Sequence, residues 1–330
     1  MKLGVSVNAG HFSDMKECAR SAEEAGLDLL AHPDSQAIDR ALYPILAVSA
    51  EHSDTITISA VATNPVTRHP TVTASAIATV DEISEGRAVV CLAVGDSAVR
   101  NTEQQPASLD TLIDSVQAIR ELLEEGQTQW NGGTSNLNWG PRSSIPVYMA
   151  ATGPRTLAAG GRVADGVVFG GHPDRIEWAI EHVESGAVEA GRDPENIEFW
   201  IATPGEVADS HQEAIDTLRH TLAAWLHIRA QGSLNDVPDE IAERIKRVAK
   251  EYRSDLHNTF DNPHNADLID KYDLREYVSD RPIAGRPSQV VEQIKDFKAR
   301  GVDGAVLLLR HNHPNRTIER LGEEVVPNLP

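Results

Sequence analysis

The chain has 330 residues, with 30 Lys and Arg against 50 Asp and Glu, and a formal net charge of −20 at pH 7. Such an acidic surface repels nucleic acid and anionic membranes, which argues against either as a partner. No apolar run approaches the roughly 20 residues of a membrane span, and the N-terminus reads as a strand rather than as a secretory signal. We therefore expect a cytoplasmic protein. Abundant carboxylates with few lysines favour a halophilic protein over an ordinary acidic one.

Short apolar segments alternate with helical segments along most of the chain. Eight of them read as strands, at residues 3–7, 27–31, 55–62, 88–94, 147–150, 166–169, 197–202 and 305–309. Helical spacing occupies residues 13–25, 70–84, 108–125, 156–163, 173–190, 288–299 and 317–324. Strands separated by helices pair in parallel with right-handed crossovers. The favoured fold is therefore α/β, a (β/α)8 TIM barrel, with a doubly wound open sheet as the alternative.

One region exceeds a minimal barrel. Residues 209–280 are highly charged and helical, with aromatic residues spaced as core anchors. We read the chain as a single TIM-barrel domain, 1–330, that carries a helical insertion at 209–280 before its last strand. The insertion could cover the site or form a subunit contact. The two cysteines, Cys18 and Cys91, are expected to be buried thiols, and neither a disulfide framework nor a metal site is predicted.

The segment Thr152-Gly-Pro-Arg-Thr156 separates a buried strand from a helix. Pro154 suits the first helical position, because its missing N–H would have no partner there. Gly153 allows close approach to the backbone, and the free N–H groups and dipole of a helix N-terminus favour an anion. This turn is a candidate phosphate cradle, and it points to a nucleotide-like cofactor.

Polar residues also follow other predicted strands, where barrel enzymes carry their active sites. After the third strand, Asn64, Thr67, Arg68 and His69 are either ligand contacts or parts of a turn that caps the next helix. After the fourth strand, Gly95 provides backbone clearance. Asp96 and Ser97 can bind ligand atoms there, and Asp96 could move a proton, unless it only caps a helix.

The second strand ends in His32-Pro-Asp-Ser-Gln36. His32 or Asp34 could be a general acid or base, and a turn-capping role for Asp34 is equally open. The chain has no Gly-x-Gly-x-x-Gly after its first strand, no P-loop lysine and no Gly-x-Ser-x-Gly elbow. Dinucleotide dehydrogenases, kinases and serine hydrolases are therefore disfavoured.

Several motifs together resemble the luciferase-like family of flavin and deazaflavin oxidoreductases. They are Asp34-Ser-Gln36, Thr63-Asn-Pro-Val-Thr-Arg-His-Pro70, Gly95-Asp-Ser-Ala98, Ala150-Ala-Thr-Gly-Pro-Arg155, Ala164-Asp-Gly166 and Ala284-Gly-Arg-Pro-Ser-Gln-Val-Val-Glu-Gln-Ile294. Within the family they are most similar to methylenetetrahydromethanopterin reductase-like members, which use the deazaflavin coenzyme F420. The resemblance implies a barrel with an insertion, a homodimer or higher oligomer, and hydride transfer to or from a pterin- or folate-like one-carbon carrier or another small substrate.

The resemblance also implies site residues. It places a non-proline cis peptide at Val61–Ala62. The implied cofactor-binding residues are Val61, Ala62, Thr63, Asn64, Gly95, Asp96, Ser97, Thr152, Gly153, Pro154, Arg155, Thr156, Gly170 and Gly171. The candidate catalytic residues are Asp96, Asp34 and His69, with His11 as a further residue on the substrate side.

One position departs from the family pattern. The methylene reductases carry a glutamate in the first strand where this chain has Ser6. A serine hydroxyl cannot serve as the same proton donor at neutral pH, so either Asp96 carries the proton chemistry or the substrate differs. Two alternatives stay open: an FMN-dependent monooxygenase of the same fold, and a non-catalytic flavin-binding barrel.

Overall fold

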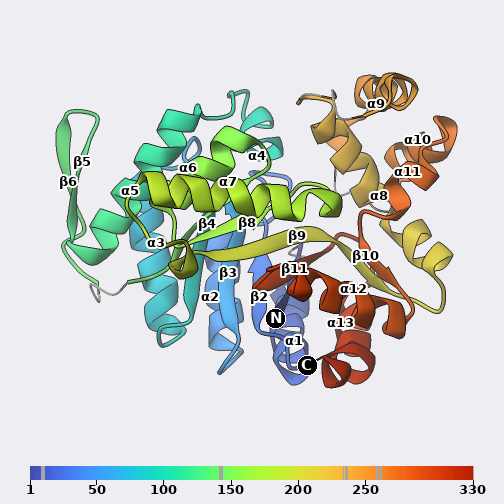
Figure 1. Ribbon diagram of the computed structural model, residues 1–330. Helices are drawn as coiled ribbons and strands as arrows, with labels where there is room; N and C mark the ends of the chain where they lie inside the picture. Colours follow the sequence, from blue (N-terminus) through green and yellow to red (C-terminus); the bar gives the residue numbers. More distant parts are fainter. Residues whose placement is uncertain are drawn as a thin grey trace.

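Eight parallel strands close into a barrel in the computed structural model, which describes residues 1–8, 12–140, 144–232, 234, 237–257, 260 and 262–329 (Figure 1). The strands are β1 (Lys2–Val7), β2 (Leu29–His32), β3 (Thr57–Thr63), β4 (Ala88–Leu92), β7 (Val147–Ala151), β8 (Gly166–Phe169), β9 (Glu198–Val207) and β11 (Gly304–Leu309). Neighbours follow the order β9-β11-β1-β2-β3-β4-β7-β8, and pairing of β8 with β9 closes the ring. The predicted TIM barrel is confirmed.

Helices surround the barrel and join its strands. They are α1 (Phe12–Glu24), α2 (Leu42–Glu51), α3 (Pro70–Ile83), α4 (Ser97–Arg100), α5 (Leu109–Glu124), α6 (Pro154–Val163), α7 (Ile176–Glu189), α12 (Pro287–Ala299) and α13 (Pro314–Arg320). The sequence predicted α1, α3, α5, α6, α7 and α12 to within a few residues. At the C-terminus it predicted a helix over 317–324, which the structure forms as α13 and a following π-helical turn, Leu321–Val325.

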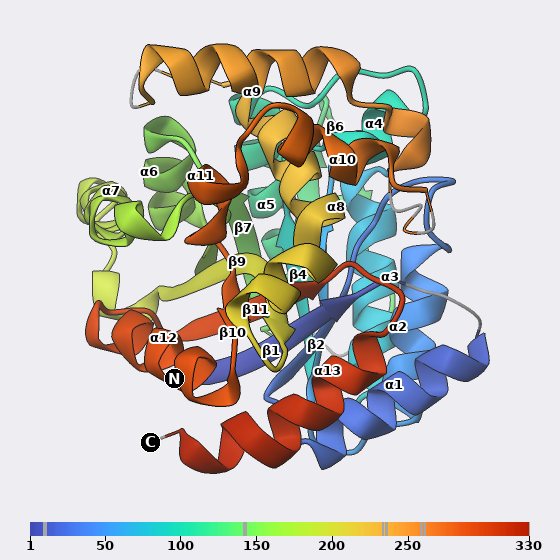
Figure 2. The same cartoon turned by 90° about the vertical axis from the view of Figure 1, so that its right-hand side faces the viewer.

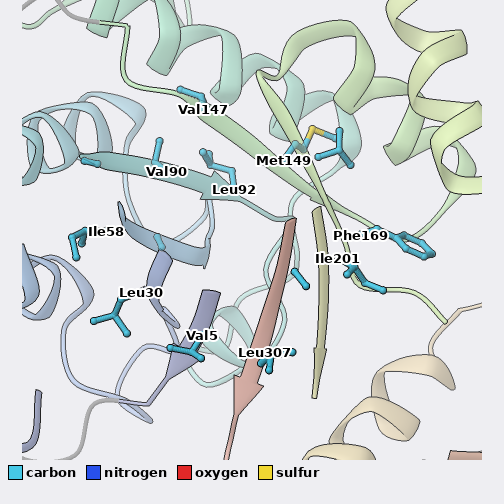
Figure 3. Close-up of a cluster of buried hydrophobic side chains, with 14 of the residues drawn as sticks. Val5, Leu30, Ile58, Val90, Leu92, Val147, Met149, Phe169, Ile201 and Leu307 are labelled. Atoms are coloured by element: carbon cyan, nitrogen blue, oxygen red, sulfur yellow. The ribbon is translucent and has the colours of Figure 1, made fainter. Parts of the chain in front are cut away.

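Strand residues alternate between two apolar layers, because successive side chains of a strand point to opposite faces. Figure 3 shows the layer between the barrel and its helices, which includes the fully buried residues Val5, Leu30 and Ile58. A second cluster fills the barrel interior and contains Tyr148 and Trp200. Burying one large apolar side chain of this kind stabilises the folded state by about 1.5–3 kcal/mol. The barrel is therefore a packed core, and ligands can reach only its ends.

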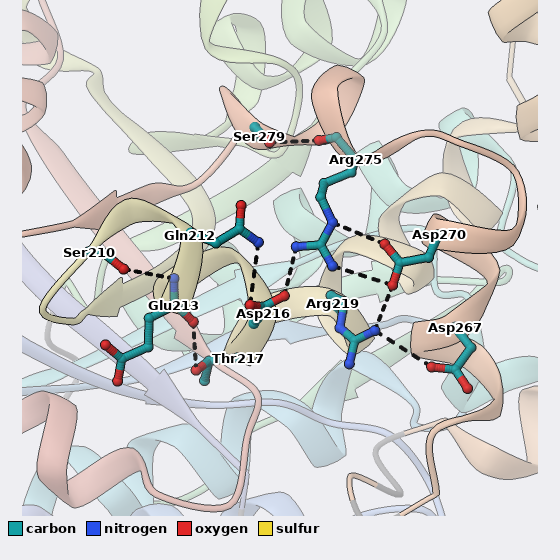
Figure 4. Close-up of polar contacts among 10 residues, drawn as sticks. All are labelled: Ser210, Gln212, Glu213, Asp216, Thr217, Arg219, Asp267, Asp270, Arg275 and Ser279. Carbon is teal, nitrogen blue, oxygen red and sulfur yellow. Dashed lines mark hydrogen bonds and ion pairs between the residues drawn. The ribbon is translucent and has the colours of Figure 1, made fainter.

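Four α-helices of the described chain lie between β9 and the short strand that follows it. They are α8 (His211–Arg229), α9 (Asp239–Glu251), α10 (His264–Lys271) and α11 (Arg275–Ser279). They share an apolar cluster of their own, and α9 crosses the top of the molecule in Figure 2. Ion pairs tie the helices together on the outside: Arg275 contacts Asp216 on α8 and Asp270 on α10 (Figure 4). A short strand, β10 (Ile283–Gly285), then pairs with the end of β9.

A hairpin that the sequence reading did not predict projects from the side of the barrel (Figure 1). Its antiparallel strands are β5 (Gln127–Trp130) and β6 (Gly133–Asn136). The turn residues Asn131 and Gly132 have φ angles of 48° and 78°. An Asn-Gly pair between strands is a strong signal for such a turn, so this dipeptide could have identified the hairpin.

Both cysteines are buried and free, as predicted. Burial raises the pKa of the Cys18 thiol to about 12 and also raises that of Cys91, so both thiols stay protonated and unreactive. Among the described residues, no helix combines the length and apolar character needed to cross a membrane.

Candidate active site

The start of α6 forms an open cradle at the end of β7. Gly153 is the N-cap residue and Pro154 takes the first helical position, as predicted. Among the described residues, no atom from outside this turn lies within 4 Å of the position that a Cβ on Gly153 would occupy. The Gly170 N–H donates to the Ala151 oxygen at 3.2 Å, which holds the end of β8 beside this turn. Free backbone donors that face open space at a helix N-terminus suit an anion such as a phosphate.

Arg281 braces the Gly170–Gly171 end from the other side. Its guanidinium donates to the Gly171 oxygen at 2.8 Å and to the Gly170 oxygen at 3.1 Å, and it lies over the Trp225 ring at 4.2 Å. The residue is 3% exposed, and among the described residues its Nε has no hydrogen-bond partner. Burial lowers the pKa of Arg281 to about 9, so it remains cationic at neutral pH. Nothing in its sequence context indicated this role.

The end of β3 carries the cis peptide that the resemblance implied, between Val61 and Ala62. Both residues are half-buried and pack against the barrel interior. The following Asn64 is 2% exposed, and its Oδ1 accepts from the Val66 and Thr67 N–H groups, each at 3.0 Å. Asn64 and Thr67 therefore form the turn after β3, which was the structural alternative for these residues.

Asp34 links the ends of β2 and β3. Its carboxylate accepts hydrogen bonds from Thr63 Oγ1 at 2.6 Å, from Gln36 Nε2 at 2.5 Å and from both terminal nitrogens of Arg68. The residue is 5% exposed. These bonds occupy both carboxylate oxygens, so the geometry gives Asp34 a bracing function at the barrel mouth.

His32, the last residue of β2, belongs to the protein interior. Its Nδ1 lies 2.8 Å from the Val7 oxygen and its Nε2 lies 2.9 Å from Ser49 Oγ. Burial, and secondarily the nearby Arg310, lower the pKa of His32 to about 4 although its bond to Val7 acts the other way. Both ring nitrogens are engaged, so His32 is a structural residue.

Asp96 and Ser97 face a cavity at the barrel mouth. Gly95 precedes them with a φ of 89°, a conformation that favours glycine. Asp96 occupies the N-cap position of α4, but its side chain makes no capping bond and instead accepts from Arg100 Nε at 2.7 Å. Ser97 Oγ lies 3.1 Å from Ser35 Oγ. The Asp96 side chain is 33% exposed. Asp96 lines a cavity together with Ser97 and Arg100, so its carboxylate is accessible from that cavity.

His69 lies elsewhere. Its side chain caps α3 by accepting from the Thr71 N–H at 3.2 Å, and its ring meets the edge of Trp130 on the hairpin at 5.9 Å. The residue is exposed and lines a 560 Å³ cavity on the outer side of the barrel, between α3, α5 and the hairpin. The structure thus brings Asp34 and Asp96 to the barrel mouth and does not bring His69 to them. His11 lies outside the described residues.

A cavity of 310 Å³ runs beneath α8. It reaches from Thr152 and Gly170, next to the α6 cradle, to Leu308 and Arg310 at the end of β11. The 170 Å³ cavity that holds Asp96 shares part of its lining with this one, namely Ala224, Ile228, Tyr252 and His257. The two cavities are therefore neighbours at this end of the barrel, and both lie beneath α8 and the segment after α9.

Ser6, the position that departs from the pattern implied by the sequence resemblance, faces a cation. Arg310 Nη2 donates to Ser6 Oγ at 3.1 Å, and Nη1 donates to Asn8 Oδ1. Sequence reasoning missed Arg310 because a single arginine after a strand gives no indication of which way it points. Among the described residues, no cluster of His, Cys, Asp and Glu could hold a metal ion.

Comparison with known proteins places this geometry in a family. A family model described as luciferase-like monooxygenase matches residues 1–304. The chain is 31% identical over 316 residues to 5,10-methylenetetrahydromethanopterin reductase of Methanopyrus kandleri, with 86% of each chain covered. It is 26% identical over 354 residues to an F420-dependent glucose-6-phosphate dehydrogenase of Amycolatopsis mediterranei, with 100% of this chain and 98% of that protein covered.

A solved structure shares the fold. The coenzyme F420-dependent tetrahydromethanopterin reductase from Methanopyrus kandleri superposes with a TM-score of 0.79 at 24% identity, and the match covers 100% of this chain and 99% of that one. Barrel, cradle and cis peptide occur together with a sequence match over nearly the whole length. The chain belongs to the luciferase-like monooxygenase family.

Proposed function

We propose that this protein is an oxidoreductase that uses coenzyme F420 and transfers a hydride between that deazaflavin and a small electrophilic substrate. The observation that carries the proposal is the open cradle at Gly153, beside which Thr152 and Gly170 line one end of the cavity beneath α8. Relatives named as F420-dependent enzymes cover most or all of this chain, which supports the choice of cofactor. The bound deazaflavin would supply the hydride chemistry, and the protein would orient the reactants and exclude water.

The residues divide into three roles in this proposal. The turn Thr152, Gly153, Pro154, Arg155 and Thr156, with Gly170 and Gly171, would hold the cofactor phosphate through its free backbone N–H groups and threonine hydroxyls, while Pro154 shapes the start of α6. The segment Val61–Asn64 would support the ring, with Gly95, Asp96 and Ser97 at its polar edge. Asp34 would position Thr63 and Arg68 rather than exchange a proton, because its oxygens are already bonded.

Asp96 is the proposed proton carrier. Its carboxylate faces a cavity and interacts electrostatically with His227 on α8 and with Tyr252 and His257 in the segment after α9. With Ser6 in place of the glutamate that the resemblance implies, Asp96 is a carboxylate of this cavity that combines partial exposure with an ion pair. Asp255 also lines the cavity, but its side chain is more exposed and pairs with Arg253. We assign His69 to the turn before α3.

A pterin- or folate-like one-carbon carrier is the proposed substrate class. The support is that the relatives include proteins named 5,10-methylenetetrahydromethanopterin reductase from Methanopyrus kandleri and Archaeoglobus fulgidus, the second 26% identical over 347 residues.

We further propose a halophilic, cytoplasmic homodimer, from the charge of −20 and the family resemblance. Light scattering at high salt would test the assembly.

Titration of the purified protein with oxidised F420 and with FMN tests the cofactor. We expect F420 to bind and FMN to bind at least tenfold more weakly.

Replacing Gly153 by Val fills the cradle and should raise the F420 Kd about tenfold, equivalent to about 1.4 kcal/mol, with the melting temperature unchanged. Gly133→Val, in the hairpin, is the control. Tight FMN binding without F420 binding would favour the FMN-dependent monooxygenase instead. Cofactor binding without turnover would favour a non-catalytic flavin-binding barrel.

A further inference from the structure

The charge inside the 310 Å³ cavity is opposite to that of the whole molecule. The protein has a net charge of −20, yet the described residues that line this cavity include Arg281 and Arg310 and no aspartate or glutamate. Low-dielectric walls strengthen the field of such cations. A cavity of this composition is suited to an anionic ligand.

Arg310 is the cation at the end of the cavity away from the α6 cradle. Its side-chain bonds to described residues go to the uncharged groups Ser6 Oγ and Asn8 Oδ1, and Asn8 in turn donates to Asp39 at 2.9 Å. Burial lowers the pKa of Arg310 to about 10, with Asp39 acting in the opposite direction. The guanidinium is thus charged at neutral pH, and no described carboxylate lies within ion-pair distance of it. A largely buried charge of this kind is costly unless a partner neutralises it.

His257 contributes a neutral donor beside Arg310. The Tyr252 hydroxyl lies 2.7 Å from His257 Nδ1. Burial raises the pKa of Tyr252, so its hydroxyl stays protonated and donates. Burial and Arg310 lower the pKa of His257 to about 4, against an opposing effect of Asp96 and with a further lowering from His227. The neutral ring then carries its proton on Nε2, and His257 lines the cavity.

We propose that Arg310 and His257 bind an anionic oxygen group of the substrate, such as a carboxylate, in the cavity beneath α8. This inference rests on the proposed function for the reaction itself and adds the class of substrate, an electrophile that also bears an anionic group. Arg310 supplies the charge, and the imidazole supplies a directed donor that is held by Tyr252. The serine at position 6 leaves Arg310 without an ion pair among the residues that the structure describes, whereas a glutamate there would neutralise it.

Benzoate and benzamide test the proposal, since they match in shape and differ in charge. Calorimetric titration at one fixed ionic strength should show benzoate binding at least tenfold more tightly to the wild-type protein. A tenfold ratio corresponds to about 1.4 kcal/mol, which a charge-assisted hydrogen bond can supply. In Arg310→Met the ratio should fall to within about twofold, and Arg310→Lys should retain part of it. His257→Asn should lower it about threefold. Arg162→Met, on the outer face of α6, is the control and should leave it unchanged.

Other outcomes would overturn the proposal. They are equal binding of both probes to the wild-type protein, a preference that survives in Arg310→Met, and a preference that disappears in Arg281→Met but not in Arg310→Met. The last result would place the anion at the cofactor end. F420 titration of the same preparations separates the two claims: normal F420 binding without a benzoate preference contradicts only this inference, whereas the preference without F420 binding contradicts only the proposed cofactor.

Discussion

Individual residues at the barrel mouth show how position determines what a titratable group can do. Asp34 and Asp96 both follow barrel strands, but Asp34 is enclosed by Thr63, Gln36 and Arg68, whereas Asp96 keeps one ion pair and a face toward a cavity. His32 is enclosed as completely as Asp34. The sequence shows the residue types after each strand, but the direction of each side chain depends on contacts with other loops.

Replacing Asp96 by Asn should lower kcat at least 100-fold, because general acid–base catalysis contributes about 10²–10⁴-fold. F420 affinity should change by less than about threefold, since the amide keeps the shape of the side chain. Steady-state kinetics and fluorescence titration measure the two quantities. Asp174→Asn is the matched control, because its side chain is 84% exposed on another loop. Unchanged turnover in Asp96→Asn would remove the residue from the proton path.

His32 should make the protein less stable at acidic pH. Its pKa is about 4 in the folded protein and about 6.5 when unfolded. The unfolded state therefore binds more protons between these values, and the free energy of unfolding falls as pH drops from about 6.5 to 4, by up to roughly 3 kcal/mol.

Urea midpoints from pH 7 to 4.5 measure this effect. The wild-type protein should lose stability over that range, and His32→Gln, less stable at pH 7, should show a shallower slope. Parallel slopes in the two proteins would show that His32 is not the group responsible.

At the scale of elements, the barrel strands and most of the helices around them were predictable from the sequence, whereas several other elements were not. Largely apolar runs of four to eight residues identified the barrel strands, because both of their faces are buried. The hairpin β5–β6 was missed because its strands are short and polar. Helix α2 was missed although its residues are mostly apolar, and β10 is only three residues long. The cavity could not be predicted, because it depends on how the covering helices α8–α11 pack on the barrel.

The ion pairs of Figure 4 predict a local effect of salt on these covering helices. In Arg275→Met, which loses contacts to Asp216 and Asp270, amide hydrogen exchange in α10 and α11 should accelerate about two- to fivefold, since partly exposed pairs contribute about 0.2–1 kcal/mol. Exchange in α3 should not change. The difference should shrink in 2 M KCl because salt screens exposed charges. A uniform acceleration throughout the chain would contradict this local role.

At the scale of the whole molecule, the net charge of −20 sets the response to salt. Mutual repulsion of surface carboxylates destabilises the compact state, and salt screens it. The melting temperature should therefore rise by several degrees between about 0.1 M and 2 M KCl. Calorimetry measures this shift. A melting temperature that is constant or falls with KCl would contradict adaptation to high salt.

The barrel carries its candidate site at the end that α8 covers. We propose that reduced F420 transfers a hydride to the substrate at this site. Anaerobic mixing of the protein with reduced F420 and methylenetetrahydromethanopterin tests this claim most directly. We predict stoichiometric reoxidation of F420 without oxygen, with reduction of the pterin to its methyl form. Reoxidation that requires oxygen, or turnover that requires FMN, would contradict the account.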